Sequence, residues 1–577
     1  MACPPYVAIK HRRRGTRIYL EEWRSYRRDG KVRSKFVRYL GPEGGKKNEA
    51  PGSVLDRLVH SDSRRAGAVR LLWKLAEEQH FRKTIDRICG ENVTPGHPST
   101  GTYLTLWAIN RVLDPESCTQ LGPWVATTDL PALAGYPEEV FTKDDFLFAL
   151  DPVCHDEPAI AQVVDHTREL DRALSSQWRE EHPLPKGEKE VLAYDLSDVL
   201  FFGVTCPIAE VGRNPDHQTR PQVNLAVVVS RHDRMPLLHF VYHGKRNGAG
   251  TTRNLLVELQ KGGVTPGLLI VDRGLLNARM VEEVRGMDWH LLGGISKSSK
   301  DVQAILDTVR VRERPETFAA KTRLGGLYAV KVRVPLWKGE REVVVYTNAE
   351  KAQREREERN EALARILEAL EKLGEQGQGW TEARLHKTIR GTIGDWKEFV
   401  EVRVRRKGKG PRVVGRLKQH ALRAAERGDG KYLLLTTDGQ LCASSAVKEY
   451  LGKDFVEKFF RTLKTFVEVE PVRHRRERRV RAYLFVCLLA LRLEMALRRR
   501  LTEGGVKEEE VAEYQERLLT ELSRVERTQV RLGGQSRQWY LNVTDHVRDG
   551  LKRLKLTDLL DERPPSATPT ATVSEKV

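Results

Sequence analysis

Residues 450–464 have the sequence YLGKDFVEKFFRTLK, which is the most informative stretch of the chain. Its polar residues recur at steps of three or four, which predicts one helix with a single polar stripe. They are Tyr450, Lys453, Glu457, Arg461 and Lys464. A carboxylate flanked by cations suits a divalent metal and the phosphates of DNA. An exposed helix with i,i+4 charge pairs would have the same pattern.

Composition favours a polyanionic partner. The 577 residues include 99 Lys and Arg against 80 Asp and Glu, a net charge of +19, so nucleic acid is the first candidate. Residues 484–497 are apolar but too short for a bilayer span and contain Arg492 and Glu494, so we expect a buried helix and no membrane partner. The N-terminus lacks the apolar core of a signal peptide and the cysteines are scattered, which predicts a cytoplasmic protein.

Residues 1–50 form a basic, β-rich module in this prediction. Short strands surround turns at Gly15 and at residues 29–30, and residues 41–53 form a linker. Basic residues lie among Tyr and Trp, a combination that suits contact with a phosphate backbone. We select four of them as DNA-binding candidates: Arg12, Arg13, Arg27 and Arg28. A solvated basic hairpin without a partner is the alternative.

A helical domain is predicted next, over residues 60–182. Apolar residues recur there with helical spacing, and no catalytic grouping is present. Arg111 and Lys143 are its candidates for contact with DNA, so we assign the domain to the binding of DNA ends.

Residues 188–298 change to strand periodicity and predict the first part of an α/β catalytic core. The expected order is β-β-β-α-β-α-β, with three antiparallel strands followed by parallel ones in a mixed sheet. Asp195 lies late in the first apolar run, and Asp272 ends the buried strand in GLLIVDRG. Carboxylates that end neighbouring strands meet in the crevice where α/β sheets bind ligands.

The remaining segments complete the predicted organisation. Residues 299–445 predict an inserted α+β domain with a hairpin around residues 338–339 and a long charged helix. Residues 446–500 contain Glu457 and predict the second part of the core. Residues 501–562 predict C-terminal helices suited to dimerisation, and the Pro-, Thr- and Ser-rich residues 563–577 predict a disordered tail.

Asp195, Asp272 and Glu457 together suggest a metal site. Two aspartates from strands and one helical glutamate suit two Mg²⁺ ions about 3.5–4 Å apart, with Mn²⁺ as a substitute. Each aspartate alone also fits a structural role, since Asp195 could cap a turn beside the rival Asp198, and Asp272 could be a turn residue. The order of the three is more specific than any member.

These residues resemble the DDE transposases of bacterial insertion sequences, in the IS-four-type superfamily that carries the YREK signature. That signature is Tyr, two residues, Arg, three residues, Glu, six residues and Lys. The matching positions are Tyr450, Lys453, Glu457 and Lys464. Lys453 departs from the family by replacing Arg, which keeps the charge but loses bidentate phosphate binding. YDLSDVLFF, LLIVDRGLL and SYRRDGKVRSKFVRYLG resemble further family blocks, whereas the loop sequences HGKRNGAGTTRNLL and GRNPDHQTRPQ are atypical.

The resemblance implies an RNase H-like mixed-sheet catalytic domain with an inserted α+β domain, preceded by the helical domain and the small β module. It implies Asp195, Asp272 and Glu457 as the Mg²⁺-binding catalytic triad. It further implies cleavage of double-stranded DNA at terminal inverted repeats, strand transfer into target DNA, and a homodimer in the synaptic complex. An aromatic residue of the insertion would stack a flipped base in relatives that form a hairpin, and the candidates are Trp337, Trp380 and Trp396.

Two alternatives stay open. One is an RNase H-fold nuclease that cleaves DNA without joining strands. The other is a non-catalytic, transposase-derived DNA-binding protein. The basic N-terminal module and the full YREK spacing argue against the nuclease, and the three intact acidic residues argue against the non-catalytic protein.

Overall fold

A computed structural model provides the structure of the chain. It describes residues 7–14, 17–28, 31–42, 58–90, 95–157, 162–212, 220–245, 252–297, 300–309, 311, 316–322, 325–377, 379–407, 410–465, 467–470, 472–532 and 535–561. The chain divides into two compact units, each of which we describe by itself. Unit 1 consists of Met1–Asp62 and Thr528–Gln538, and unit 2 of Ser63–Arg527 and Trp539–Val577.

Unit 1 contains a three-stranded antiparallel sheet. The strands β1 (Val7–Arg14), β2 (Arg17–Arg28) and β3 (Lys31–Pro42) pair in that order, which confirms the strands expected from the sequence. The predicted turn positions at residues 15–16 and 29–30 lie outside the described part of the chain. The ring of Trp23 contacts Phe36 edge to face with 5.8 Å between centroids, so an aromatic pair joins β2 to β3 across the sheet.

Unit 2 begins with helices that surround the buried helix α16 (Glu477–Glu503). They are α1 (Gly67–Glu78), α2 (Phe81–Cys89), α3 (Thr100–Leu113), α4 (Cys118–Ala126), α5 (Leu130–Ala134), α6 (Lys143–Ala149) and α7 (Thr167–Glu181). The predicted helical pattern is confirmed. A short hairpin of β5 (Cys154–Glu157) and β6 (Gln162–Asp165) interrupts it and was not predicted.

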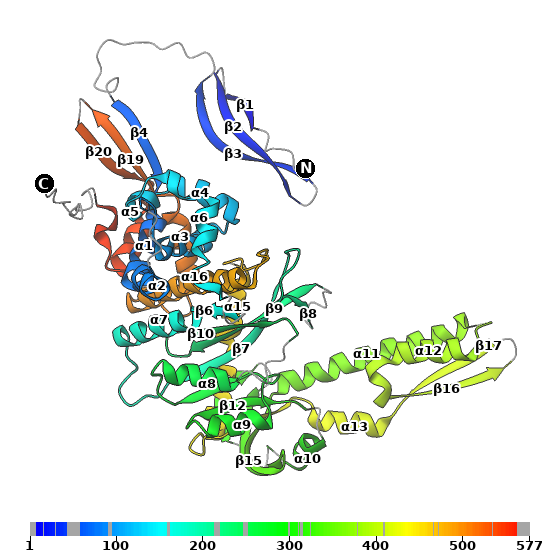
Figure 1. Ribbon diagram of the computed structural model, residues 1–577. Coiled ribbons are helices and arrows are strands. Elements are labelled where there is room, and N and C mark those ends of the chain that lie inside the picture. The colour runs from blue at the N-terminus through cyan, green and yellow to red at the C-terminus, as the bar shows by residue number, and fades with distance from the viewer. Residues whose placement is uncertain are drawn as a thin grey trace. The chain divides into compact units, whose positions relative to one another are not determined.

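A mixed sheet forms the centre of unit 2. Its first elements are β7 (Val191–Leu200), β9 (Pro221–Ser230), β10 (Pro236–His243), α8 (Thr252–Lys261), β11 (Leu268–Val271), α9 (Ala278–Arg285) and β12 (His290–Ile295). The strands lie side by side in the order β10-β9-β7-β11-β12, with the short β8 (Glu210–Val211) paired to β9. The first three strands are antiparallel, and β7, β11 and β12 are parallel, so the predicted order of elements is confirmed. Figure 1 shows α8 and α9 beside this sheet.

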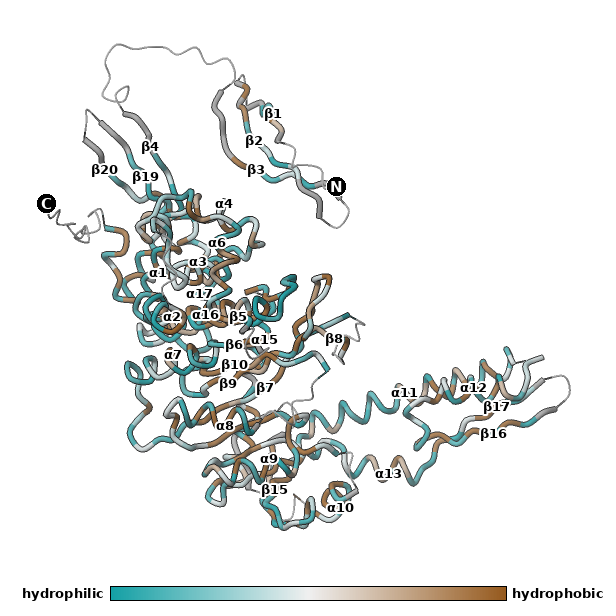
Figure 2. The backbone as a smooth tube through the Cα atoms, in the orientation of Figure 1, coloured by the Kyte–Doolittle hydropathy of each residue, from teal (hydrophilic) through white to brown (hydrophobic). Residues whose placement is uncertain are grey.

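Both faces of the sheet are buried. Leu192 and Tyr194 of β7 pack in one apolar cluster, whereas Ala193 between them packs in another, because successive strand residues point to opposite faces. Figure 2 shows the hydrophobic colouring along β7 and β9 that this burial requires. A sheet covered on both sides gives continuous apolar runs, which explains why these strands were visible in the sequence.

The sheet continues further than the sequence indicated. β18 (Lys431–Thr436), β15 (Gly339–Thr347), β14 (Gly325–Leu336) and β13 (Glu316–Thr322) extend it beyond β12. All four lie within residues 299–445, the predicted inserted domain, and β13 was not predicted. A local pattern does not reveal which sheet a hairpin joins. The β14–β15 hairpin itself is confirmed, with Trp337 and Lys338 at positive φ in its two-residue turn.

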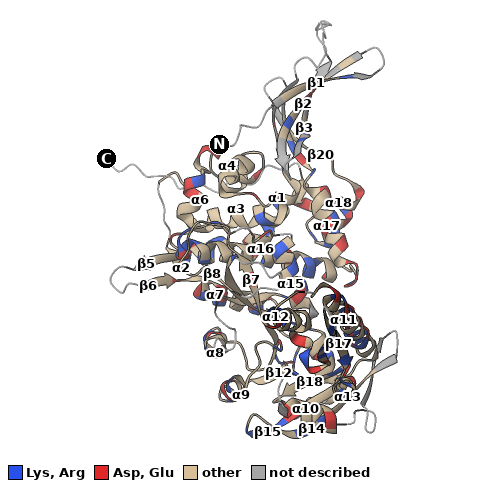
Figure 3. Ribbon diagram, turned by 90° about the vertical axis from the view of Figure 1, so that its right-hand side faces the viewer, with Lys and Arg blue, Asp and Glu red and all other residues tan. Residues whose placement is uncertain are grey.

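The rest of the predicted insertion packs around its own apolar cluster. It contains α11 (Ala349–Gln376), α12 (Glu382–Ile393), β16 (Val400–Lys407), β17 (Gly410–Leu417) and α13 (Gln419–Gly428). The long charged helix is confirmed as α11, on which Figure 3 marks both basic and acidic residues. Leu363 and Leu370 of α11 pack against Val413 of β17, which fixes the helix on this hairpin.

The stretch 450–464 differs from its prediction. It does not form one helix, because α14 (Ala443–Leu451) ends before Gly452 and α15 (Asp454–Thr465) begins after Lys453. Glycine is a poor helix former, and the break places Tyr450 and Glu457 on different helices. The predicted single stripe is therefore wrong, although the apolar face of α15 is buried as expected.

The C-terminal region also differs. α17 (Val511–Leu522) and α18 (Asp545–Arg553) are helices as expected, but β19 (Glu526–Leu532) and β20 (Gln535–Leu541) form a sheet with the distant β4 (Leu58–Arg65). The partner strand is remote in sequence, so no local pattern could reveal the pairing. The tail at residues 563–577 lies outside the described residues, and none of the described helices is long and apolar enough to cross a membrane.

Candidate functional site

Asp195 and Asp272 lie on neighbouring parallel strands of the sheet. Val271, the last residue of β11, pairs with Tyr194 of β7, so each aspartate is the residue that follows one member of this pair. Asp272 ends its strand as predicted. Asp195 does not, because β7 continues to Leu200 in its pairing with β9. The two carboxylates are therefore placed where β11 stops and β7 continues alone on that side.

Asp272 is held by two residues of the signature. Its Oδ1 accepts a hydrogen bond of 3.2 Å from the Tyr450 hydroxyl and one of 3.0 Å from the Lys453 ammonium. Burial alone would raise the pKa of Asp272, but Lys453 outweighs burial and holds that pKa below its usual value. Lys453 is thus a direct partner of the carboxylate.

A glycine makes room for this arrangement. A Cβ on Gly294 of β12 would lie 2.4 Å from the Tyr450 hydroxyl oxygen and 3.3 Å from Cβ of Arg273. No larger residue fits there without moving Tyr450. Sequence reasoning missed Gly294, and its one signal was the Gly-Gly pair inside the strand sequence HLLGGI.

Asp195 lies in the electrostatic field of the other acidic residues. Burial, helped by the charges of Asp272 and Glu457, raises the pKa of its carboxyl to about 6. A hydrogen bond of 2.8 Å from the Leu196 amide and the charge of Lys453 oppose this shift. The charges of Asp272 and of the exposed Glu457, both chosen from the sequence, therefore act on Asp195.

The two later cations of the signature face other partners. Lys464 on α15 lies 3.6 Å from Asp198 and 3.8 Å from Glu470. Asp198, the rival of Asp195, is thus an ion-pair partner of Lys464. Arg461 is exposed and lines a cavity of about 620 Å³ between α15, α16 and α17, together with Lys458. Neither cation contacts Asp272.

The N-terminal candidates lie in unit 1. Arg12 is exposed and forms an ion pair of 3.4 Å with Glu21. The side chains of Arg13, Arg27 and Arg28 lie outside the described part of the structure, so their role in DNA binding stays a prediction.

The three tryptophans of the predicted insertion lie against apolar clusters. Trp337 packs on the central sheet, whereas Trp380 and Trp396 pack on the cluster around α11. The Arg384 guanidinium lies 4.4 Å from the Trp380 ring centroid. Base stacking by any of the three stays a prediction.

The acidic residues suit Mg²⁺ by their chemistry, because Asp195, Asp272 and Glu457 offer only hard carboxylate oxygens. Among the described residues, no three His, Cys, Asp or Glu side chains are close enough together to hold a metal ion. Lys453 instead places its ammonium against Asp272 at 3.0 Å. Metal binding would thus require Lys453 to give up this contact.

Comparisons with known proteins complete the description. No protein-family model matches the chain, and no curated protein matches it. Among solved structures, it is similar to a piggyBac transposase synaptic complex with hairpin DNA, with a TM-score of 0.37 and 11% identity over 88% of this chain and 87% of that chain. The case for a function therefore depends on the residues of the site.

Proposed function

We propose that the protein is a DNA transposase of the DDE class, which cleaves DNA at the ends of a mobile element and joins them to target DNA. The observation that carries the proposal is the raised pKa of the Asp195 carboxyl. Its pKa is raised to about 6 by burial and by the nearby Asp272 and Glu457. A half-buried carboxylate near two others, with one lysine among them, is suited to binding divalent cations.

The topology of the sheet supports this proposal. The order β10-β9-β7-β11-β12, with three antiparallel strands and two further parallel ones, is the arrangement expected of an RNase H-like catalytic domain. Asp195 on the first strand and Asp272 after the fourth then occupy the positions of the first two acidic residues. α15 supplies Glu457 from a distant part of the chain.

The roles of the residues follow from their contacts. Asp195, Asp272 and Glu457 would hold Mg²⁺ or Mn²⁺, two ions in all, which would activate the attacking oxygen and stabilise the leaving one. Tyr450 orients Asp272 through its 3.2 Å hydrogen bond. Lys453, once released from Asp272, would hold a phosphate of the DNA end, and Arg461 and Lys464 supply further positive charge on α15.

The partner would be double-stranded DNA, first as terminal inverted repeats and then as target. The net charge of +19 supports a polyanionic partner. Arg12, Arg13, Arg27 and Arg28 are the proposed contacts of unit 1. A homodimer would bring two element ends together in the synaptic complex.

Cleavage of DNA that carries the ends of the element, in Mg²⁺, tests the proposal. Glu457→Gln keeps size and removes the charge, so we expect DNA binding to persist and cleavage to fall at least about a thousandfold. Glu358→Gln, an exposed change on α11, is the matched control and should cleave like the wild type. Full cleavage by Glu457→Gln would contradict the assignment.

The same assay separates the alternatives. Cleavage without strand transfer would indicate a nuclease with this fold. Binding without cleavage in both Mg²⁺ and Mn²⁺ would indicate a non-catalytic DNA-binding protein.

A further inference from the structure

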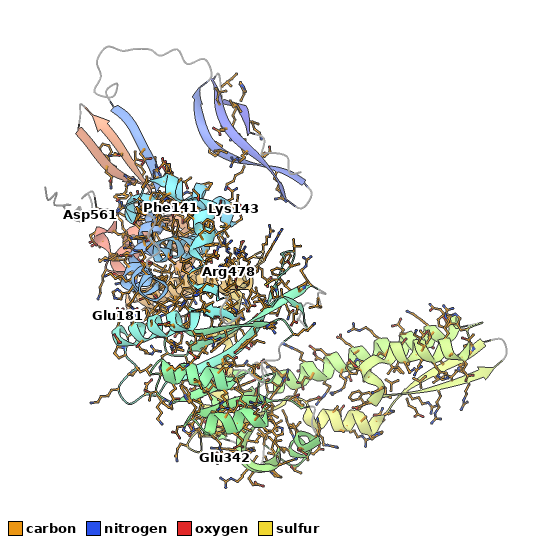
Figure 4. The ribbon with its side chains drawn as sticks, in the orientation of Figure 1. Phe141, Lys143, Glu181, Glu342, Arg478 and Asp561 are labelled. Carbon is orange, nitrogen blue, oxygen red and sulfur yellow. The ribbon has the colours of Figure 1, made fainter. Side chains whose placement is uncertain are left out.

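A polar cavity of about 560 Å³ lies apart from the acidic site. It is formed by α3, α6, α16 and the segment at residues 468–474. Its lining includes three cationic side chains, those of Arg111, Lys143 and Arg473. Arg111 and Lys143 are the two residues of the helical domain that the sequence marked as candidates for DNA contact, and Figure 4 labels Lys143.

Arg111 is a buried cation that only neutral groups contact. It is 5% exposed, and its Nη1 donates to the backbone oxygen of Glu468 at 3.3 Å and to the Tyr483 hydroxyl at 3.2 Å. Its Nη2 donates to the backbone oxygen of Glu116. Within the described residues, Arg111 forms no ion pair with a carboxylate. A buried charge without a counter-charge is costly, so the cavity favours an anion.

Two further cations line the same cavity without a carboxylate partner. Lys143 and Arg473 are exposed, and neither forms an ion pair among the residues that the structure describes. Of the three acidic lining residues, Glu470 accepts the Leu200 amide at 2.9 Å and lies 3.8 Å from Lys464. Glu116 is half-buried and Glu468 is exposed, and both carboxylates oppose anion binding.

The cavity is connected to the strand that carries Asp195. Glu470 binds the amide of Leu200, the last residue of β7, and the Phe202 amide donates to the Val472 oxygen at 2.7 Å. Five residues of strand separate Asp195 from Leu200, a length of about 16 Å. A DNA strand that passes the acidic residues could therefore reach this cavity within a few nucleotides.

We propose that this cavity binds a phosphate group through Arg111, Lys143 and Arg473. The source that follows from the proposed function, on which this part of the inference rests, is the backbone of the DNA strand beyond the acidic site. Free phosphate is the other source of the same chemistry.

The test uses the full chain without divalent metal, so that binding is measured apart from cleavage. Inorganic phosphate is titrated calorimetrically, and a labelled duplex oligonucleotide is titrated by fluorescence anisotropy at several salt concentrations. For the double variant Lys143→Ala with Arg473→Ala, we expect both affinities to fall about tenfold and the salt slope for DNA to decrease by about 2. Lys83→Ala, an exposed lysine on α2, is the control and should change neither.

Two further variants sharpen the test. Glu468→Gln removes the opposing charge, so it should strengthen phosphate binding several-fold, an effect that a purely structural role would not produce. Arg111→Gln should abolish phosphate binding, and if that variant does not fold, the double variant and Glu468→Gln decide. Wild-type affinity for phosphate in the double variant would overturn the proposal.

The outcomes also separate the two sources. Loss of phosphate binding with unchanged DNA affinity would support the phosphate site and reject the DNA strand as its source. Loss of both affinities in a protein that never cleaves DNA would support the inference while the proposed transposase function fails.

Discussion

Strand β7 has carboxylates at two sites, and the protein balances their charges differently. Just before its start, Glu190 lies with Asp233, which belongs to the turn between β9 and β10, and both side chains are buried. At its middle, the half-buried Asp195 lies in the field of Asp272 and Glu457. The first site is neutralised by arginine, and the second is not.

The first site, which consists of Glu190 and Asp233 at the start of β7, is a closed ion network. Arg179 donates to both oxygens of Glu190 at 3.0 and 3.1 Å and to Asp233 at 2.6 Å. Trp178 adds a hydrogen bond of 2.7 Å to Asp233. Burial would raise the pKa of Asp233, but Arg179 overcomes burial and lowers it. Such carboxylates are structural.

The second site lacks this compensation. Among the residues that the structure describes, Lys453 is the one cation that contacts a carboxylate of this site, that of Asp272. The pKa of Asp195 is accordingly raised to about 6. The comparison teaches that burial alone does not mark a functional carboxylate. A functional carboxylate is distinguished by partial burial close to other carboxylates, with too few cations of the protein to balance their charge.

The largest expected effect comes from opening the closed network. Arg179→Ala leaves the buried Glu190 without a cation and leaves Asp233 with Arg499 alone at 3.5 Å, so we expect the free energy of unfolding to fall by about 3–5 kcal/mol. Urea unfolding followed by circular dichroism measures it, with Glu180→Ala, an exposed change on the same helix, as a control. A loss of unfolding free energy no greater than that of the control would contradict the distinction between the Glu190 site and the Asp195 site.

A pair of substitutions of opposite sign gives the next largest effect. The raised pKa of Asp195 means that its ionisation destabilises the metal-free fold, and this loss develops as pH rises from the ordinary value of 3.8 to about 6 and is complete above that. Asp195→Asn should therefore stabilise the protein by about 2 kcal/mol at pH 7.5 and by nothing near pH 4. Asp233 has a lowered pKa, so its contribution is present at neutral pH and is lost as pH falls through that lowered value. Asp233→Asn should destabilise at pH 7.5.

Unfolding of both variants in EDTA across pH 4–8 checks these signs. If Asp195→Asn destabilised the metal-free protein at pH 7.5, the acidic residues would be part of a structural network after all.

The smallest expected effect concerns Lys453. Its ammonium contacts Asp272 at 3.0 Å, where it competes with a divalent cation. Lys453→Ala should strengthen Mg²⁺ binding by the free protein about fivefold, as seen by calorimetry, and Lys448→Ala on α14 should not change it. Weaker Mg²⁺ binding in Lys453→Ala would show that Lys453 supports the site instead of competing for it.

Much of the central sheet could be predicted because both of its faces are buried. Continuous apolar runs located β9, β10, β11 and β12, and Asp272 followed directly from the end of its strand. The break at Gly452 could not be seen, because a three- and four-residue spacing persists in the sequence even where the helix stops. The space that Gly294 leaves for Tyr450 depends on a contact between residues far apart in the chain.

Other differences arise from long-range pairing. β19 and β20 join β4, and the hairpin of β14 and β15 joins the central sheet. Local patterns predict strands but not their distant partners. The charges of the signature were likewise visible, whereas the pairing of Lys464 with Asp198 required the fold.

Titration with Mn²⁺, followed by electron paramagnetic resonance, tests the central claim most directly. The wild type, Asp195→Asn and Asp233→Asn are compared at pH 7.5, where Asp195 is ionised. We predict that the wild type and Asp233→Asn bind Mn²⁺ and that Asp195→Asn loses this binding. Equal Mn²⁺ binding by Asp195→Asn and the wild type would contradict the assignment of a metal site to Asp195 and its acidic neighbours.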